Sequence, residues 1–201
     1  MLPGDGRRLD LDDIAKTVAN EAEKKGLLPK SESPKPDSAT SAPPTLIRGY
    51  DRFTDKTLVE IQKVLIFSEN RNAILNYGIG EFWLLAGYEY KGQQKVTPAF
   101  VVLGFSSIET TSHTEFMSVE NRNLILLVDG ERLPLGVLAE RLFHIERVGN
   151  EERLELAVPL TTFMKIANAK MVEGRLGRVE FALKDPHLAA LRALLDDISR
   201  P

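Results

Sequence analysis

The residues of this chain that most often carry enzyme chemistry are three histidines, which lie far apart in the sequence. His113, His144 and His187 show none of the short spacings of a metal-binding pair. Only His113 has a hydroxyl and a carboxylate, Ser112 and Glu115, close by. Because neighbours in an extended chain point to opposite sides, they form no Ser–His–acid relay by themselves. A hydrolase centred on His113 and Glu115 requires the fold to join these side chains in a cleft. We expect His144 to be a structural strand residue and His187 to be solvated at a helix start.

Signatures of phosphate, cofactor and metal binding are incomplete. Gly78-Ile79-Gly80 lacks the third glycine and the preceding strand of a dinucleotide-binding turn, and no P-loop pattern occurs. The chain has no cysteine, which excludes disulfides, thiolate metal sites and thiol nucleophiles. Asp129 and Glu131 fit a hairpin turn better than a calcium site, because no further oxygen ligands cluster near them in the sequence. We therefore predict a non-enzymatic protein with no metal and no cofactor.

Three aromatic residues, Trp83, Tyr88 and Tyr90, share one short segment. On an exposed sheet face they would stack on sugar rings, and inside the domain they would be ordinary core residues. The first interpretation gives the alternative function of a small-ligand or carbohydrate-binding β-module.

The composition is that of an ordinary soluble globular protein and argues against two classes of partner. The chain has 201 residues, 43% apolar and 27% charged, with a net charge of −3. Nucleic-acid-binding domains are usually basic, so we expect no nucleic-acid partner. The longest apolar runs, Phe82–Tyr88 and Ala99–Phe105, are much shorter than the roughly 18–20 residues of a membrane-spanning helix. We expect no transmembrane segment, and membrane association only through a partner.

The first 48 residues differ in composition from the rest. Leu11, Ile14 and Val18 recur at helical spacing, which predicts a short amphipathic helix in an arm of residues 1–27. Residues 28–48 are rich in proline and serine and predict an extended linker. Because so short a helix is marginal alone in water, its apolar stripe needs a surface. Either the helix folds back on its own domain, or it docks in a groove of another protein.

Residues 49–201 predict one β-rich domain. Apolar runs predict strands at Thr57–Phe67, Glu81–Tyr90, Thr97–Phe105, Asn123–Val128, Glu131–Leu135, Val137–Val148, Arg153–Val158 and Arg178–Leu183. The run Thr97–Phe105 is apolar on both faces, as in a central strand covered on each side. Asp129-Gly130 and Gly149-Asn150 predict tight hairpin turns, and Pro134 predicts a sheet edge.

The last third of the chain predicts two helices. One begins at a threonine cap, Thr161 or Thr162, and the other at Asp185-Pro186. Short strands without β-α-β alternation favour a mainly β fold with C-terminal α: an antiparallel sandwich or partly closed barrel, preceded by an extended N-terminal arm. The C-terminal helix is expected to seal an open end or a sheet face.

The tetrapeptide Glu-Asn-Arg-Asn occurs twice, at residues 69–72 and 120–123, each time before an apolar stretch. A duplicated hairpin would explain this echo, and so would the preference of asparagine for turns. If the echo is a duplication, Arg71 and Arg122 form a paired recognition surface.

The leading hypothesis is therefore a protein–protein interaction module, or an accessory subunit of a larger assembly, docked through its N-terminal arm. No export signal follows Met1, so we expect a cytoplasmic protein. If a leader preceded Met1, an extracytoplasmic domain on a Pro/Ser stalk would have the same sequence features.

Overall fold

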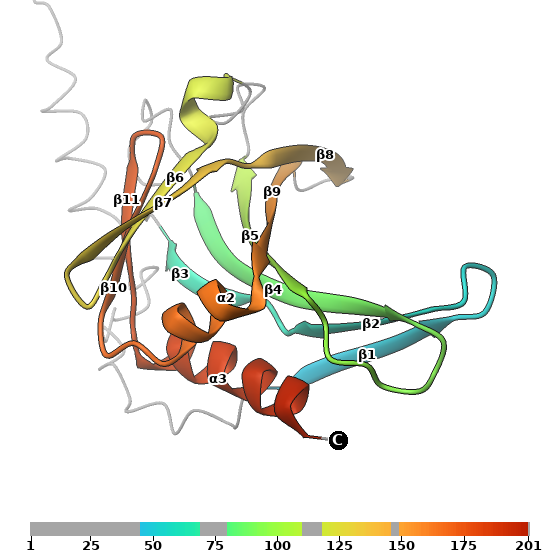
Figure 1. Ribbon diagram of the computed structural model, residues 1–201. Coiled ribbons are helices and arrows are strands. Elements are labelled where there is room, and N and C mark those ends of the chain that lie inside the picture. Colours follow the sequence, from blue (N-terminus) through green and yellow to red (C-terminus); the bar gives the residue numbers. More distant parts are fainter. Residues whose placement is uncertain (1–44, 69–79, 110–117, 146–148, 201) are drawn as a thin grey trace, which may run out of the picture. The chain divides into compact units, whose positions relative to one another are not determined.

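The computed structural model describes residues 45–68, 80–109, 118–145 and 149–200 (Figure 1). The predicted arm and most of the predicted linker lie outside these residues. The described elements, labelled as in Figure 1, are β1 (Leu46–Asp51), β2 (Lys56–Ile61), β3 (Val64–Ser68), β4 (Glu81–Lys91), β5 (Phe100–Glu109), η1 (Val119–Arg122), β6 (Asn123–Val128), β7 (Glu131–Val137), β8 (Ala139–Ile145), β9 (Gly149–Pro159), α2 (Leu160–Ala167), β10 (Val172–Leu176), β11 (Val179–Leu183) and α3 (Asp185–Ser199). Within these ranges, no helix is long and apolar enough to cross a membrane.

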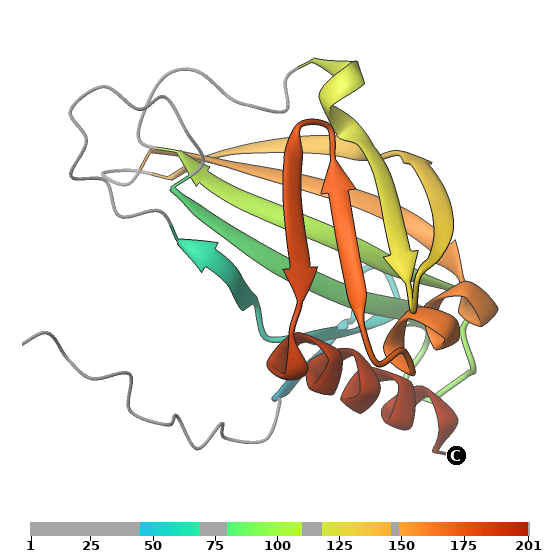
Figure 2. The same ribbon diagram turned by 90° about the vertical axis from the view of Figure 1, so that its left-hand side faces the viewer.

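The strands form two antiparallel sheets. The large sheet has the order β1-β2-β4-β5-β9-β8, and its seventh strand, β3, also pairs with β4. The small sheet has the order β11-β10-β6-β7. The two sheets face each other and are not closed into a barrel (Figures 1 and 2). The mainly β fold with a C-terminal helix is as predicted.

The core lies between the two sheets, where three phenylalanines meet. The rings of Phe82 in β4 and Phe105 in β5 are stacked at 5.4 Å, and Phe181 of β11 lies 5.5 Å and 5.0 Å from them. These residues come from both sheets, so their contact joins the layers. A Cβ at Gly174 in β10 would lie 2.3 Å from the Phe181 ring, so glycine at this position leaves room for that ring.

Helix α3 closes one end of the space between the sheets, as predicted (Figures 1 and 2). Leu188, Leu191, Leu195 and Ile198, which the sequence places on one face, are all buried. Proline occupies the first turn of α3, as predicted, although the cap residue is Lys184 rather than Asp185. The predicted threonine cap of the shorter helix is wrong, because α2 begins at Leu160 and its cap is Pro159.

The hairpin β6–β7 agrees closely with the sequence prediction. Asp129 and Gly130 both have positive φ, at 50° and 84°, as a two-residue hairpin turn requires. Strand β7 is an edge of the small sheet and carries Pro134, also as predicted.

Other strand predictions need correction. The predicted strand Thr57–Phe67 is divided at residues 62–63 into β2 and β3, and a register shift between Leu65 and Phe67 leaves Leu65 exposed. Strand β5 is central but not covered on both sides, because Phe100 and Val102 are exposed on its outer face. The β8–β9 hairpin is present, with Gly149 and Asn150 inside β9 rather than in the turn. Strand β10 was missed.

The predicted linker also ends too late. Strand β1 begins at Leu46, inside the range 28–48, and pairs with β2 without interruption from Leu46 to Asp51. The last residues of that range therefore belong to the folded domain.

Candidate functional site

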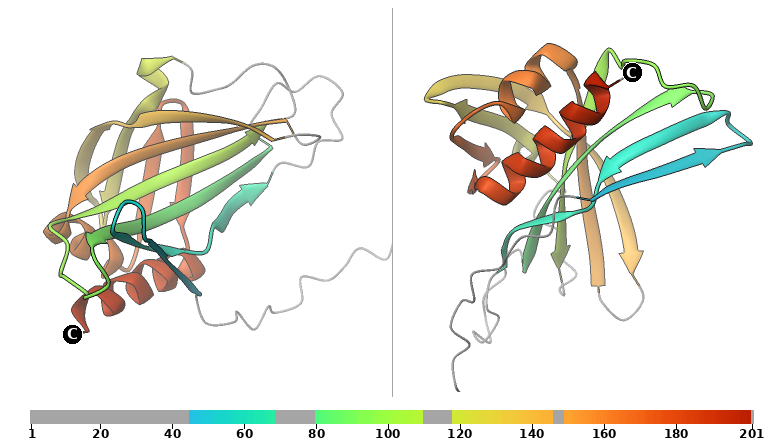
Figure 3. Two further views of the ribbon diagram at one scale, coloured as in Figure 1. Left: turned by 90° about the vertical axis from the view of Figure 1, so that its right-hand side faces the viewer. Right: turned by 90° about the horizontal axis from the view of Figure 1, so that it is seen from below.

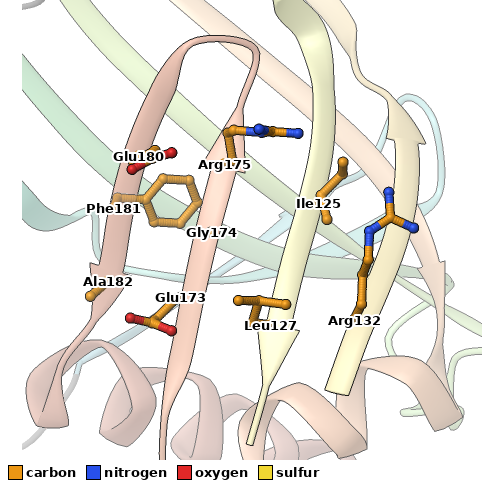
Figure 4. Close-up of a pocket in the computed structure, with 9 residues that line it drawn as sticks. All are labelled: Ile125, Leu127, Arg132, Glu173, Gly174, Arg175, Glu180, Phe181 and Ala182. Atoms are coloured by element: carbon orange, nitrogen blue, oxygen red, sulfur yellow. The ribbon is translucent and has the colours of Figure 1, made fainter. Parts of the chain in front are cut away.

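The outer face of the small sheet, which points away from the large sheet, contains a shallow depression of about 550 Å³ (Figure 4). Its floor is apolar, with Ile125 and Leu127 from β6 and Ala182 from β11. Leu127 is 39% exposed. The depression is therefore a solvent-facing apolar surface rather than part of the core.

Four charged side chains lie among these apolar residues: Glu173, Arg175, Glu180 and Arg132. The register places Arg175 beside Glu180, yet Arg175 extends toward β6, away from that carboxylate (Figure 4). Within the described part of the chain, none of these four side chains has an ion-pair partner. The face thus combines exposed apolar side chains with charges that no ion pair in the described residues neutralises, a combination that interaction surfaces also show.

A second candidate surface is the β1–β2 hairpin, which projects beyond α3 (Figures 1 and 3). Its β1 strand is an edge of the large sheet. Four large apolar side chains of the hairpin are exposed: Ile47, Tyr50, Phe53 and Leu58. Phe53, at the tip, is 85% exposed, and the Arg52 guanidinium lies over its ring at 4.8 Å.

Hydrogen bonds hold the tip of this hairpin in shape. The Asp51 carboxylate accepts bonds from the Phe53 backbone N–H and the Thr54 hydroxyl, each at 2.8 Å. These two bonds also hold the pKa of Asp51 below its ordinary value. Phe53 therefore stands on a loop with a defined conformation.

A polar cluster anchors the base of the hairpin to the end of α3. Arg48 of β1 donates to the Tyr90 hydroxyl at 2.7 Å and to both oxygens of Asp197 at 3.1 Å. The Tyr88 hydroxyl donates to Asp197 at 2.6 Å. Burial and this hydrogen bond to a carboxylate raise the pKa of Tyr88. Lys95 donates to two carbonyls at the end of the helix, where a cation is favourable.

The structure does not bring the predicted aromatic platform together. Tyr88 is 1% exposed, and Tyr88 and Tyr90 point inward from β4. Trp83 stands on the opposite face of the same strand, because side chains alternate along a strand. The two tyrosines serve the core and the cluster at Asp197, as the core interpretation expects.

The structure describes two of the three histidines that the sequence offers as candidates for chemistry. His144 lies in β8, as predicted, and His113 and Glu115 are outside the described residues. The prediction for His187 is wrong: it is 3% exposed, its Nδ1 accepts the Lys184 N–H, and its Nε2 lies 2.8 Å from the Leu65 carbonyl oxygen.

The remaining acidic candidates also have structural partners. Asp129 accepts two backbone N–H bonds, from Lys170 and Met171, which join the β6–β7 turn to the segment before β10. Within the described ranges, no group of three His, Cys, Asp or Glu side chains is arranged to hold a metal ion.

Most of the predicted partner-binding residues, Leu11, Ile14, Val18 and Arg71, lie outside the described residues. Arg122, at the end of η1, is mostly buried and forms an ion pair with Glu140 of β8. The pairing of Arg71 with Arg122 in one recognition surface stays a prediction.

The sequence patterns predict neither of the two candidate surfaces. The outer face of the small sheet becomes visible only once β10 is recognised between β6 and β11. The first three residues of the exposed strand β1, residues 46–48, fall within the predicted linker. A signal was present in the run Leu46–Tyr50, which contains apolar residues and no proline.

Comparison of the chain with protein-family models, with curated proteins and with solved structures finds no match.

Proposed function

We propose that this chain is a non-enzymatic protein-binding module, an accessory subunit of a larger assembly, which binds an extended segment of a partner protein along the free edge of β1. The observation that supports the proposal is a regular edge strand with exposed apolar side chains and without proline, lysine or a bulge. Exposed strand edges pair readily with other chains, and proteins usually protect them with proline, lysine or a bulge. Strand β1 has none of these.

The hydrogen-bond pattern defines which backbone groups the edge offers. The Gln62 N–H donates to the Thr45 carbonyl, so alternate residues from Thr45 onward bond to β2. The N–H and C=O groups of the residues between them, Leu46, Arg48 and Tyr50, consequently point to the open side. A partner strand would pair with these three residues, as in the strand-addition mode of peptide recognition.

The side chains of the hairpin supply contacts beside this edge. Ile47 lies on the outer face of the large sheet and Tyr50 on the inner side, while Phe53 projects from the tip. Aromatic and arginine side chains dominate the energetics of many interfaces, and Arg52 and Phe53 form such a pair. The partner is therefore an extended segment followed by an apolar pocket that receives Phe53.

The predicted N-terminal arm fits this proposal as a second contact. Its apolar stripe of Leu11, Ile14 and Val18 precedes β1 in the chain. Two linked contacts with one partner would bind more tightly than either alone, because the second contact forms at a high effective concentration.

Capture of a partner by immobilised full-length protein, followed by titration with that purified partner, tests the proposal. We expect Phe53→Ser and Tyr50→Pro each to weaken binding at least about 10-fold, since they remove an anchor and an edge donor. Phe100→Ser is the matched control, because Phe100 is exposed elsewhere on the large sheet. Equal affinity of wild-type protein and the folded Phe53→Ser and Tyr50→Pro variants would contradict the proposal.

A further inference from the structure

The outer face of the small sheet carries its side chains in two rows that cross the strands. The register places Glu180, Arg175 and Ile125 in the first row. The second row contains Ala182, Glu173, Leu127 and Arg132. The two rows meet at β10 and β6, where a basic residue stands beside an acidic one and an isoleucine beside a leucine.

We propose that this face binds a second copy of the same chain, related by a two-fold axis that crosses the strands between the two rows. This rotation places the first row of one copy on the second row of the other. Arg175 then faces Glu173 of the second copy, and Ile125 faces its Leu127. Each contact occurs twice, as a two-fold interface requires.

The charge pattern selects this axis over the alternative. An axis parallel to the strands would place Arg175 against Ile125 of the second copy and Glu173 against its Leu127. That arrangement would bury two charged residues against apolar groups, which is unfavourable. For these four central residues, only the axis across the strands pairs opposite charges and apolar residues at once, and it leaves Glu180 opposite Ala182 of the second copy at the margin of the face.

The charged side chains are available for such contacts. Within the described residues, Glu173 and Arg175 have no ion-pair partner, although each is exposed. Their pairing across an interface therefore breaks no described ion pair. The interaction is electrostatic in part, so added salt weakens it.

The area of this face determines how tightly the two copies are expected to associate. From strand spacing and rise, the four strands cover about 14 Å by about 17 Å. This area is well below the roughly 800 Å² per partner of a standard interface. We therefore expect a reversible dimer that forms at high protein concentration.

Sedimentation of the full-length chain between about 1 μM and about 1 mM tests the proposal. We expect the wild-type protein to shift from monomer to dimer across this range. Arg175→Glu and Glu173→Arg each bring like charges together and weaken association at least about 10-fold. Lys91→Glu, which makes the same change of charge as Arg175→Glu on an exposed residue of the large sheet, leaves association unchanged.

Two further samples test whether residue 175 of one copy faces residue 173 of the other. A mixture of the Arg175→Glu and Glu173→Arg chains forms a heterodimer, because each supplies the charge that the other needs. The double variant Glu173→Arg, Arg175→Glu dimerises as the wild-type protein does. A wild-type protein that stays monomeric throughout, or a mixture that stays monomeric while both chains are folded, overturns the proposal. A dimer that Tyr50→Pro abolishes and Arg175→Glu does not affect assigns the second copy to β1 and also overturns it.

Discussion

One edge strand of the small sheet, β7, differs in character from one edge strand of the large sheet, β1. Strand β7 carries Pro134, and the pairing of β6 with β7 shifts register between Leu124 and Ile125. Because Ile125 and Pro134 form a pair without hydrogen bonds, the missing N–H of Pro134 lies on the open side of the strand. Strand β1 has an unbroken register and no proline or lysine.

This difference separates an edge that carries protections against pairing with other chains from an edge that lacks them. A proline and a bulge at the open side of β7 are common protections against association between edges. Their absence from β1, together with an ordered tip that exposes Phe53, is the basis for assigning the binding role to β1.

The largest expected effect on stability lies in the core that joins the two sheets. Phe82→Ala removes a fully buried ring that contacts both Phe105 and Phe181. We expect a loss of about 3–5 kcal/mol in the free energy of unfolding, measured by chemical denaturation. A loss below about 1 kcal/mol would show that the two layers do not depend on this contact.

A smaller effect is expected at the protected hairpin. Asp129→Ala removes the acceptor of two backbone N–H bonds, from Lys170 and Met171, and replaces a residue at positive φ. The expected loss in the free energy of unfolding is about 1–3 kcal/mol. Asp129→Asn serves as the control, because asparagine tolerates this backbone conformation and should lose less stability.

The free energy of unfolding is expected to depend on pH through the ion pair of Lys63, between β2 and β3, with Glu151 of β9. Burial by itself raises the pKa of Glu151, but hydrogen bonds from Lys63 and Ser106 outweigh it and hold the pKa below its ordinary value. The pair therefore adds stability above the ordinary glutamate pKa, and this contribution is lost as the pH falls through the lower folded pKa.

Lys63→Met tests this pair. The expected loss is below about 1 kcal/mol at neutral pH, because the pair is partly exposed. The pKa of Glu151, followed by NMR titration, rises in the variant. The stability difference between variant and wild-type protein shrinks in acid. A difference that stays constant from neutral to acid pH would show that Lys63 acts through packing alone.

The smallest effect on stability is expected at the unprotected hairpin. Phe53→Ser changes a side chain that contacts mainly solvent and Arg52, so the free energy of unfolding should change by no more than about 0.5 kcal/mol. Thermal or chemical denaturation measures this change. A loss above about 2 kcal/mol would mean that Phe53 packs within the domain and is not free to bind a partner.

The fold was predictable where local signals agreed with the final packing. The Asp129-Gly130 turn, the edge position of Pro134 and the buried stripe of α3 all depend on short-range patterns. Strand β10 was missed because Gly174 interrupts its apolar alternation, and only the packed ring of Phe181 explains a glycine there.

The candidate surfaces were less predictable, because they depend on which strands become neighbours. Trp83 and Tyr88 are close in sequence but lie on opposite faces of β4. His187 appears solvent-exposed in sequence and is buried by its contact with Leu65, a residue 122 positions away. The edge character of β1 follows from sheet order, which no local pattern contains.

Amide hydrogen exchange at single-residue resolution tests the binding role of β1 most directly. In the isolated protein we expect the amides of Leu46, Arg48 and Tyr50 to exchange quickly and those of Ile47 and Gly49 to be protected. Binding of the captured partner should slow exchange at Leu46, Arg48 and Tyr50. Exchange that stays fast at these three amides in the complex, or is already slow in the dilute isolated protein, would contradict the account.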